Sequence, residues 1–264
     1  MLRIATWNVN SIRIRLSSLQ KFVDCHKPDI ICLQETKVVD RYFPYNVIKS
    51  MGFEYILVRG EKSYNGVAVL SKIPFDTAPS LSFVNNDTRH VAIRISSLEL
   101  EIHNFYIPAG GDDPDVEMNP KFKHKIEYVQ AMSNWLKSKK REQDKMVIVG
   151  DLNIAPYETD VWSHKQLLKV VSHTPIEVDN FNQMKESGKL EDALRKIIPI
   201  EEKLFSWWSY RNRDWKKSNR GRRLDHILVS NPLYNNVCNG FICKEVRDYE
   251  SPSDHVPVIC DFKF

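Results

Sequence analysis

The sequence contains no long hydrophobic run and does not open on a secretory leader. Residues 1 to 6 have no basic start followed by an apolar stretch and a small-residue cleavage site, and no later run approaches the length of a membrane span. We therefore expect a soluble, cytoplasmic protein with no membrane partner.

Cysteine is also scarce. The five cysteines form no Cys-x-x-Cys pair, and most lie within apolar runs that resemble strands. An odd number without metal-type spacing argues against a disulfide framework and against a zinc site. We expect buried free thiols.

Linkers and repeats are absent as well. No Pro-, Gly- or Ser-rich tract divides the 264 residues, and no strong internal repeat is present. Hydrophobic residues make up 42% of the chain and charged residues 27%, which is enough to form a core without disulfides. We expect one domain over residues 1–264.

The net charge of +4 is small, but the charged residues are unevenly distributed along the chain. Residues 211–223 hold seven cations and one anion, a local charge of +6, so the rest of the chain carries −2. A basic patch on a mildly acidic body favours a polyanionic ligand, although a solvated surface loop is the alternative. The cations are Arg211, Arg213, Lys216, Lys217, Arg220, Arg222 and Arg223.

Short apolar, β-branched runs alternate with helical spacing, which predicts an α/β protein. Helices are expected near 15–26 and 120–140, the second opened by Pro120, and long loops at 108–120 and 206–223. The expected strands cover residues 2–9, 29–33, 55–58, 67–70, 91–95, 100–107, 146–149, 224–229 and 256–262.

Polar side chains stand where these strands end or begin. Asn8 closes the first strand, Glu35 follows the second, and Asp151 follows the run 146–149. Asp225 and the pair Asp254-His255 adjoin the last two strands. A single strand-end carboxylate is usually a turn or a cap, but five such motifs in one chain indicate a site at one edge of a sheet.

This set suits the hydrolysis of a phosphodiester. The substrate is anionic and repels hydroxide, so the reaction needs charge neutralisation, an activated water and help for the departing oxygen. Hard oxygen ligands suit Mg²⁺, for which Glu35 is the best candidate.

In order and spacing, several motifs resemble those of exonuclease III and related abasic-site (AP) endonucleases. The resemblance covers essentially the whole chain, and some of its motifs are shared across the wider endonuclease/exonuclease/phosphatase superfamily. It implies a four-layer α/β sandwich, with two mixed β-sheets packed face to face and helices on the outside. The motifs are Asn8, 33–37, 106–108, 150–153, 223–225 and 253–255.

The resemblance also implies roles for individual residues. Glu35 would hold the metal with help from Asn8 and Asp254. Asp151 would activate or orient the attacking water, with protonation of the leaving group as the alternative. The remaining implied catalytic residues are Asn153, which would position a phosphate oxygen and water, Tyr106, which would contact the phosphate or leaving group, and His255, which would be oriented by Asp225 and donate to the phosphate.

Two features narrow the substrate within this superfamily. Tyr106 followed by x-Pro is similar to the repair nucleases, whereas several relatives place a histidine in this region; His103 lies on the opposite strand face and is expected to be structural. Aromatic residues interleaved with cations at 205–223 resemble the family's pocket for a flipped abasic sugar. We expect substrate contacts from Lys37, Trp207, Trp208, Tyr210, Arg211, Trp215, Arg220 and Arg223, with at least one of Trp207 and Trp208 buried in the structure. Lys37 could instead support the metal-ligand region or be an ordinary surface lysine.

Two departures from the family pattern stand out. Ala109 follows Tyr106-Ile107-Pro108 where family members often carry a side-chain amide, so one phosphate or water contact would be absent or supplied elsewhere. The segment 162–166 also differs; a helix face is the expected environment of Trp162 and Lys165, and a binding role for either residue is the alternative.

Together these observations predict a single Mg²⁺-dependent catalytic domain, with Mn²⁺ as a substitute, that acts on double-stranded DNA. It would incise 5′ to abasic sites and remove 3′ blocking groups or nucleotides, as a monomer. The alternatives are a superfamily phosphatase or lipid phosphodiesterase acting on phosphorylated polyols, and an inactive DNA-binding module.

Overall fold

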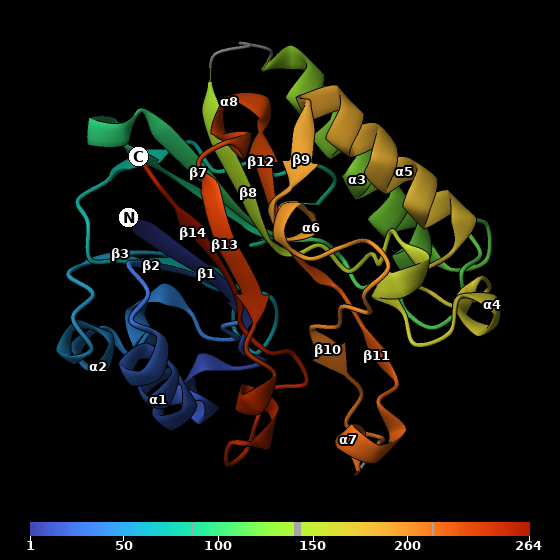
Figure 1. The fold of residues 1–264 in the computed structure, drawn as a ribbon, viewed down its shortest axis with the longest axis horizontal. Helices are drawn as coiled ribbons and strands as arrows, with labels where there is room; N and C mark the ends of the chain where they lie inside the picture. Colours follow the sequence, from blue (N-terminus) through green and yellow to red (C-terminus); the bar gives the residue numbers. More distant parts are fainter. Residues whose placement is uncertain (86, 140–143, 213) are drawn as a thin grey trace.

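Two six-stranded sheets form the centre of the molecule (Figure 1). The computed structural model describes residues 1–85, 87–139, 144–212 and 214–264; Arg213, one of the predicted basic residues, lies outside them. In strand order, the first sheet contains β13 (Val237–Ile242), β14 (Val258–Phe262), β1 (Leu2–Asn8), β2 (Ile30–Gln34), β4 (Val67–Ser71) and β3 (Tyr55–Arg59). The second contains β5 (Asp76–Ala78), β6 (His90–Ile95), β7 (Leu100–Tyr106), β8 (Lys145–Asp151), β12 (Asp225–Ser230) and β9 (Leu190–Asp192).

Both sheets are mixed. Strand β1 runs parallel to β2, and β7 runs parallel to β8, whereas the other neighbouring pairs are antiparallel. Each parallel pair therefore brings two strand carboxyl ends to the same edge of its sheet.

Alternating side chains divide the core into layers. In β1, Leu2 and Ile4 belong to the cluster between the sheets, whereas Ala5 and Trp7 face the helical side. The outer cluster of the first sheet includes residues of α1 (Leu16–His26) and α2 (Tyr45–Ser50), and that of the second includes residues of α3 (Pro120–Ser138) and α5 (Pro175–Gly188). The result is the helix, sheet, sheet, helix arrangement that was predicted.

A buried polar contact ties the two sheets together. Asn104 of β7 accepts a hydrogen bond from Gln34 Nε2 (2.7 Å) and donates to the backbone oxygens of Leu33 and Ala68 (2.9 Å each). Because an unpaired amide in this position would be costly, these bonds favour one register of the two sheets.

A small third sheet projects near the open end of the sandwich (Figure 1). It pairs β10 (Trp207–Trp208) with β11 (Gly221–Arg222), with α7 (Trp215–Ser218) between them. The predicted loop at 206–223 is therefore partly regular. The remaining short elements are α4 (His164–Leu167), α6 (Ala193–Ile197), α8 (Asn231–Tyr234) and the 3₁₀ turns η1 (Ile12–Ile14), η2 (Asp40–Tyr42), η3 (Ser96–Leu98), η4 (Glu158–Asp160) and η5 (Lys244–Asp248).

The expected strands and the two expected helices all have counterparts, with boundaries shifted by a few residues, while β5, β9, β13 and α5 were not foreseen. All five cysteines are free; Cys25 and Cys238 are exposed, so the expectation of burial is wrong for these two. Among the described residues, no helix is long and apolar enough to cross a membrane.

Candidate active site

On each strand, the site residue ends the row of alternate side chains that point toward the other sheet. Asn8 follows Leu2, Ile4 and Thr6 at every second position of β1, and Tyr106, Asp151 and Asp225 hold the same relation to the core residues of β7, β8 and β12. Their side chains therefore enter the space between the sheets just where the apolar core ends.

Gly150 allows β8 to place the aspartate that follows it. Its φ is +142°, and a Cβ there would lie 1.8 Å from the Phe105 backbone oxygen of β7. Any larger residue would push the two parallel strands apart. The register then sets Asp151 beside Tyr106 on one side and beside Asp225 on the other.

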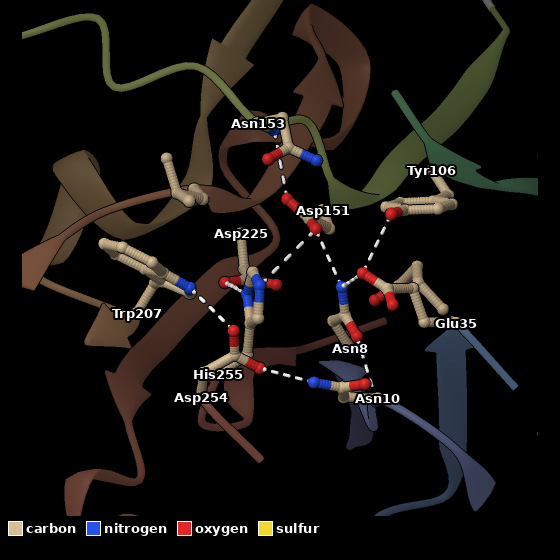
Figure 2. Close-up of polar contacts among 12 residues, drawn as sticks. Asn8, Asn10, Glu35, Tyr106, Asp151, Asn153, Trp207, Asp225, Asp254 and His255 are labelled. Carbon is tan, nitrogen blue, oxygen red and sulfur yellow. Dashed lines mark hydrogen bonds and ion pairs between the residues drawn. The ribbon is translucent and has the colours of Figure 1, made fainter. Parts of the chain in front are cut away.

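Asn8 links two carboxylates from different sheets (Figure 2). Its Nδ2 donates to Glu35 Oε1 (2.9 Å) and to Asp151 Oδ2 (2.8 Å). The Tyr106 hydroxyl donates to the same Glu35 oxygen (2.8 Å). Burial and the nearby Glu35 and Asp151 charges raise the pKa of Tyr106 well above its ordinary value, so the phenol stays a hydrogen-bond donor.

Glu35 is held as an anion. It has a left-handed φ of 52°, and Lys37 Nζ lies 2.7 Å from its Oε2. Burial opposes its ionisation, but hydrogen bonds from Asn8 and Lys37 outweigh burial and lower the pKa of Glu35. Lys37 also donates to Asn10 Oδ1 (2.6 Å).

His255 lies between two aspartates. Its Nδ1 is 2.8 Å from Asp225 Oδ2, and its Nε2 is 3.6 Å from Asp151 Oδ2. Burial alone would lower the pKa of His255, but Asp225 and Asp151 raise it to about 10, so the ring is cationic at neutral pH. Ser206 Oγ donates to Asp225 Oδ2 (2.6 Å) and accepts from the Asp225 backbone N–H (3.1 Å), which fixes that carboxylate.

Asp151 is almost completely buried. Burial raises its pKa most, the His255 charge opposes the rise and Asp225 adds to it, and the pKa of Asp151 reaches about 7. A carboxylate with a pKa near neutrality can accept a proton from water and return it within one reaction cycle.

Asp254 lies beside His255, and its carboxylate is bound between Trp207 and Asn10 (Figure 2). Its Oδ1 accepts from Asn10 Nδ2 (3.1 Å) and its Oδ2 from Trp207 Nε1 (3.0 Å). Burial opposes ionisation here as well, but His255 and these donors lower the pKa of Asp254. The neighbouring Ser253 hydroxyl donates to the Asn8 backbone oxygen (2.7 Å), which joins β1 to the segment before β14.

Asn153 completes the polar group. Its backbone N–H donates to Asp151 Oδ1 (3.1 Å) and its Nδ2 to the Ile107 oxygen (3.0 Å). Behind it, the buried Lys125 ammonium donates to the Asn153 backbone oxygen (2.7 Å) and pairs with Glu177 (2.5 Å). A helix in one layer thus positions a loop of the site.

Six of these residues line a cleft of about 570 Å³, namely Glu35, Tyr106, Asp151, Asn153, Asp254 and His255. The lining also includes apolar and basic residues; these are Trp162, Leu167, Val170, Val171, Trp207, Arg211, Arg220, Arg222 and Leu224. A polar centre beside an apolar and cationic wall can hold an anion together with a less polar substituent.

Comparison with known proteins gives the family. Residues 5–255 match the model of the Endonuclease/Exonuclease/phosphatase family. The chain belongs to this family.

Several nucleases are similar to this chain over almost its whole length. Exodeoxyribonuclease III of Haemophilus influenzae is 30% identical over 273 aligned residues, covering 99% of this chain and 100% of the relative. The structure of an AP endonuclease from Archaeoglobus fulgidus superposes with a TM-score of 0.92 at 31% identity, and that of the 3′ phosphatase NExo from Neisseria, bound to a product DNA hairpin, with 0.91 at 30%; both cover 100% of each chain. The resemblance and the fold class predicted from the sequence are confirmed.

The predicted aromatic and basic residues of segment 205–223 divide into two groups, those that line the cleft and those that do not. Trp207, Arg211 and Arg220 line the cleft. Tyr210, Trp215, Trp208 and Arg223 do not occur among the described residues that line it. Tyr210 donates to the Pro252 oxygen and Trp215 to Asp248.

Trp208 and Arg223 are interior residues. Trp208 is fully buried, which confirms that at least one tryptophan of the pair belongs to the core. Arg223 is 0% exposed, and its Nη2 lies 2.8 Å from Asp160 and 2.7 Å from Asp192. This placement differs from the expected substrate contact, because a guanidinium enclosed by two carboxylates has no access to a ligand.

The segment 162–166 also differs from expectation. Trp162 precedes α4 and lies outside the helix; its backbone N–H donates to the Gly221 oxygen (3.1 Å), and the residue lines the cleft. The helix-face interpretation is wrong for Trp162 and correct for Lys165, which is exposed on α4. Ala109 lines the cleft too, and its backbone oxygen accepts from Lys125 (3.2 Å). His103 is buried against His90, as a structural role requires.

The donor set around Glu35 fits a hard divalent cation. Glu35, Asp254, Asn8 and Asn10 offer carboxylate and amide oxygens, and the Lys37 ammonium already lies against Glu35 and Asn10. Asp151, Asp225 and His255 are also close enough together to hold a metal ion. However, Asp225 occupies one His255 nitrogen and Asp151 faces the other, so the oxygen-rich side suits Mg²⁺ better.

Sequence reasoning gave no role to several residues that shape the site, although Ser253 stands inside the motif 253–255. Asn10, Ser206 and Ser253 each bond directly to a predicted site residue, but they are common residue types with many other uses. Proximity to a motif was the only available signal, since Ser253 adjoins Asp254 and Asn10 follows Asn8 by two positions.

Proposed function

We propose that this chain is a Mg²⁺-dependent DNA phosphodiesterase, with Mn²⁺ able to substitute, that incises duplex DNA on the 5′ side of abasic sites and removes 3′ blocking groups or nucleotides. The observation that carries the proposal is the cationic His255 held between Asp225 and Asp151 in the same cleft as Glu35. The names of the relatives, exodeoxyribonuclease III and AP endonuclease, support DNA as the substrate.

His255 stabilises charge on the phosphate. Its Nδ1 is held by Asp225, so Nε2 is the nitrogen free to donate to a phosphate oxygen as negative charge increases. The Tyr106 hydroxyl turns from Glu35 to contact the phosphate or the leaving group, and the Asn153 amide orients a phosphate oxygen or the attacking water.

Asp151 accepts the proton of the attacking water. Its pKa of about 7 matches this role at neutral pH, and Asn8 and Asn153 hold its two oxygens in place. Water then forms the new bond to phosphorus, the bond between phosphorus and the 3′ oxygen of the upstream nucleotide breaks, and that oxygen takes up a proton to leave as a 3′-hydroxyl.

Glu35 would hold the metal, assisted by Asn8 and Asp254. When bound, a divalent cation neutralises phosphate charge and supports the departing oxygen. Lys37 supports this region through Glu35 and Asn10.

The wall formed by Trp207, Trp162 and Leu224 receives the abasic deoxyribose. This sugar lacks a base, so moving it out of the helix costs less than flipping an intact nucleotide. Arg211 and Arg220 contact phosphates at the rim. We further propose that residues 1–264 act as one catalytic domain, because one core cluster contains residues of both sheets, and that the protein is a monomer.

The test uses a labelled duplex with one abasic analogue and an intact duplex, each with Mg²⁺ and with chelator. Metal-dependent incision 5′ to the lesion supports the endonuclease, and shortening from the 3′ end of the intact strand adds the exonuclease. If neither duplex is cut while phosphorylated polyols are hydrolysed, the DNA proposal fails.

An Asp151→Asn variant tests the assigned base. We expect kcat to fall by about a hundredfold or more, because general-base catalysis contributes roughly 10²–10⁴, while binding of the abasic duplex changes little. Fluorescence anisotropy in Ca²⁺ measures binding, and circular dichroism checks the fold. A variant that cuts at the wild-type rate contradicts the role of Asp151.

A further inference from the structure

Three side chains that can bind a metal ion meet outside the cleft, on the helix-covered side of the first sheet. His26 is the last residue of α1, Cys243 follows β13, and Glu245 lies in η5. Their ligand atoms, one from each residue, all lie within 4.8 Å of one another. None of the three is among the described residues that line the cleft. An imidazole, a thiol and a carboxylate therefore converge at a second place in the fold.

The position of His26 is fixed by its neighbours. Its ring packs against Phe22 and Phe241, with ring centres 5.1 and 5.9 Å apart, respectively. Its backbone oxygen accepts a hydrogen bond from Arg3 Nη1 (2.6 Å). The imidazole is thus held beside Cys243, a residue 217 positions away in the sequence.

The separation of the imidazole and the thiol suits a bridging metal ion. His26 Nδ1 lies 4.0 Å from Cys243 Sγ. Zinc bonds of about 2.0–2.1 Å to nitrogen and about 2.3 Å to sulfur place these two atoms roughly 3.6 Å apart at a tetrahedral angle. The two side chains would need to approach by only about 0.4 Å to share one ion.

Glu245 can supply the third ligand. Its Oε1 lies 2.9 Å from His26 Nε2, the ring nitrogen that does not face the thiol, and its side chain is 55% exposed. An exposed ion pair contributes little stability, so the carboxylate is free to leave Nε2 and turn toward an ion at Nδ1. Cys243 is buried, so the ion enters from the side of Glu245, and a water completes a tetrahedral set.

Two features of the surroundings oppose a cation, and both are offset. The Arg3 guanidinium lies near Cys243, but Asp261 neutralises it through bonds to Nε (2.7 Å) and Nη2 (2.8 Å). Burial raises the pKa of the Cys243 thiol, and Glu245 adds to the rise, so the sulfur keeps its proton while no ion is bound. A metal ion displaces such a proton to solvent when it binds the sulfur.

The types of donor decide which ion fits. Mg²⁺ takes oxygen ligands, whereas thiolate, imidazole and carboxylate are together the ligands of zinc. We infer that His26, Cys243 and Glu245 form a Zn²⁺ site that fastens the end of α1 to the segment after β13. The site is separate from the proposed Mg²⁺ site and does not depend on nuclease activity. Local sequence spacing gave no sign of it, because its ligands come from opposite ends of the chain.

The experiment uses Cd²⁺ as a probe, because a thiolate bound to Cd²⁺ gives an ultraviolet charge-transfer band that oxygen and nitrogen ligands do not give. Metal-free protein is titrated with Cd²⁺ under reducing conditions without added thiol, and an excess of Zn²⁺ follows. The variants are Cys243→Ser, His26→Gln and Glu245→Gln, with circular dichroism to check their fold. The matched control is the double variant Cys25→Ser/Cys238→Ser, which removes the two exposed cysteines.

We expect wild type and the double variant to show the band at one equivalent of Cd²⁺ and to lose it in excess Zn²⁺. Ions in the cleft add no band, since no described residue that lines it is a cysteine. Cys243→Ser should abolish the band. His26→Gln should weaken Cd²⁺ binding by at least about a hundredfold, since loss of an outer partner of a ligand alone costs roughly 10–100-fold. Glu245→Gln should weaken it by only about tenfold, because this ligand is exposed and must first leave His26.

The absence of a band in wild type overturns the inference, whether or not any variant folds. A band that survives Cys243→Ser, or one that is lost in Cys25→Ser/Cys238→Ser, also overturns it, because the exposed cysteines would then be the ligands. Unchanged Cd²⁺ affinity in His26→Gln rejects a site shared with α1, and a band that excess Zn²⁺ does not remove rejects zinc as the ion. Failure of the proposed nuclease activity would leave all of these results unchanged.

Discussion

Arg222 and Arg223 are neighbours in the chain but have opposite surroundings. Arg222 lines the cleft with unused donors, whereas Arg223 lies between Asp160 and Asp192 with no exposed surface. Asp160 also pairs with Arg195 (2.5 Å), so the two acids and two guanidiniums form one interior network. Both carboxylates raise the pKa of Arg223 despite its burial, which keeps it charged.

Replacing Arg223 by methionine should therefore reduce stability without altering substrate contact directly. The change leaves Asp160 and Asp192 buried with fewer partners, and breaking a buried ion pair from one side costs about 3–5 kcal/mol. Urea unfolding of Arg223→Met should show this loss in the free energy of unfolding. An unchanged unfolding midpoint together with a higher KM for DNA would restore the original substrate-binding interpretation.

At the scale of single residues, the sequence predicts which residues form the site better than it predicts whether a given side chain points into the cleft or into the protein interior. Glu35, Asp151 and His255 could be found because carboxylates and imidazoles at strand ends are rare in combination. Arg223 was misplaced because a run of like charges does not reveal which members point inward. Ser206 was missed because a serine that orients Asp225 looks like any loop serine.

At the scale of elements, the loop after β8 is held by three buried side chains. Consecutive backbone oxygens of Asn153, Ile154 and Ala155 lie 2.7, 2.7 and 2.6 Å from nitrogens of Lys125, His226 and His173, respectively. These side chains come from α3, β12 and the segment before α5. The loop that carries the site is thus held by side chains from a helix, a strand and a neighbouring loop.

Lys125→Met should loosen this loop. The ammonium donates to Glu177, Asn153 and Ala109, and methionine keeps most of the side-chain length but none of the donors. We expect a loss of about 3–5 kcal/mol in the free energy of unfolding, since Glu177 stays buried, and a fall in kcat larger than any change in KM as Asn153 shifts.

The control is Lys123→Met, which removes an exposed lysine from the same helix. It should change neither stability nor kcat appreciably. Equal effects of the two substitutions would show that Lys125 contributes only a positive charge and that its hydrogen bonds to the loop do not matter.

The elements that sequence reasoning missed have identifiable causes. The buried face of α5 includes Glu177, Asn180 and Ser187, so its apolar spacing is weak. In β13, Cys238 and Asn239 are exposed and the register shifts between Val237 and Asn239, which interrupts the alternation of a strand. The two-residue strands β10 and β11 are too short to produce a pattern.

At the scale of the whole molecule, periodicity predicts α/β but does not order the strands. The inward rows of both sheets are apolar and β-branched, and such rows could pair in many registers. The four-layer arrangement came from the resemblance of motifs spread along the chain. The contact of Asn104 with Gln34, Leu33 and Ala68 depends on pairing between distant segments that no local pattern predicts.

The second sheet also contains a buried histidine pair that links global stability to pH. The Leu81 backbone N–H donates to His90 Nδ1 (2.9 Å), so His90 Nε2 carries the hydrogen and donates to His103 Nδ1 (3.0 Å). His103 Nε2 then lies 2.9 Å from Glu101. Burial lowers the pKa of both rings, most strongly for His90, where the neighbouring His103 adds to the effect. Both rings are therefore neutral in the folded protein, each as one tautomer.

Acid should destabilise the fold through this pair. Below a pH of about 6.5 the unfolded histidines bind protons while the folded ones do not, so the free energy of unfolding falls as pH decreases, by up to about 1.4 kcal/mol per pH unit for each such proton. A His90→Gln variant can still accept from Leu81 and donate to His103 but cannot titrate. In urea unfolding between pH 7.5 and 5, its stability should fall less steeply than that of wild type, with the two curves diverging only below pH 6.5. Parallel curves over this range would show that His90 is already protonated in the folded state or takes no part in the acid response.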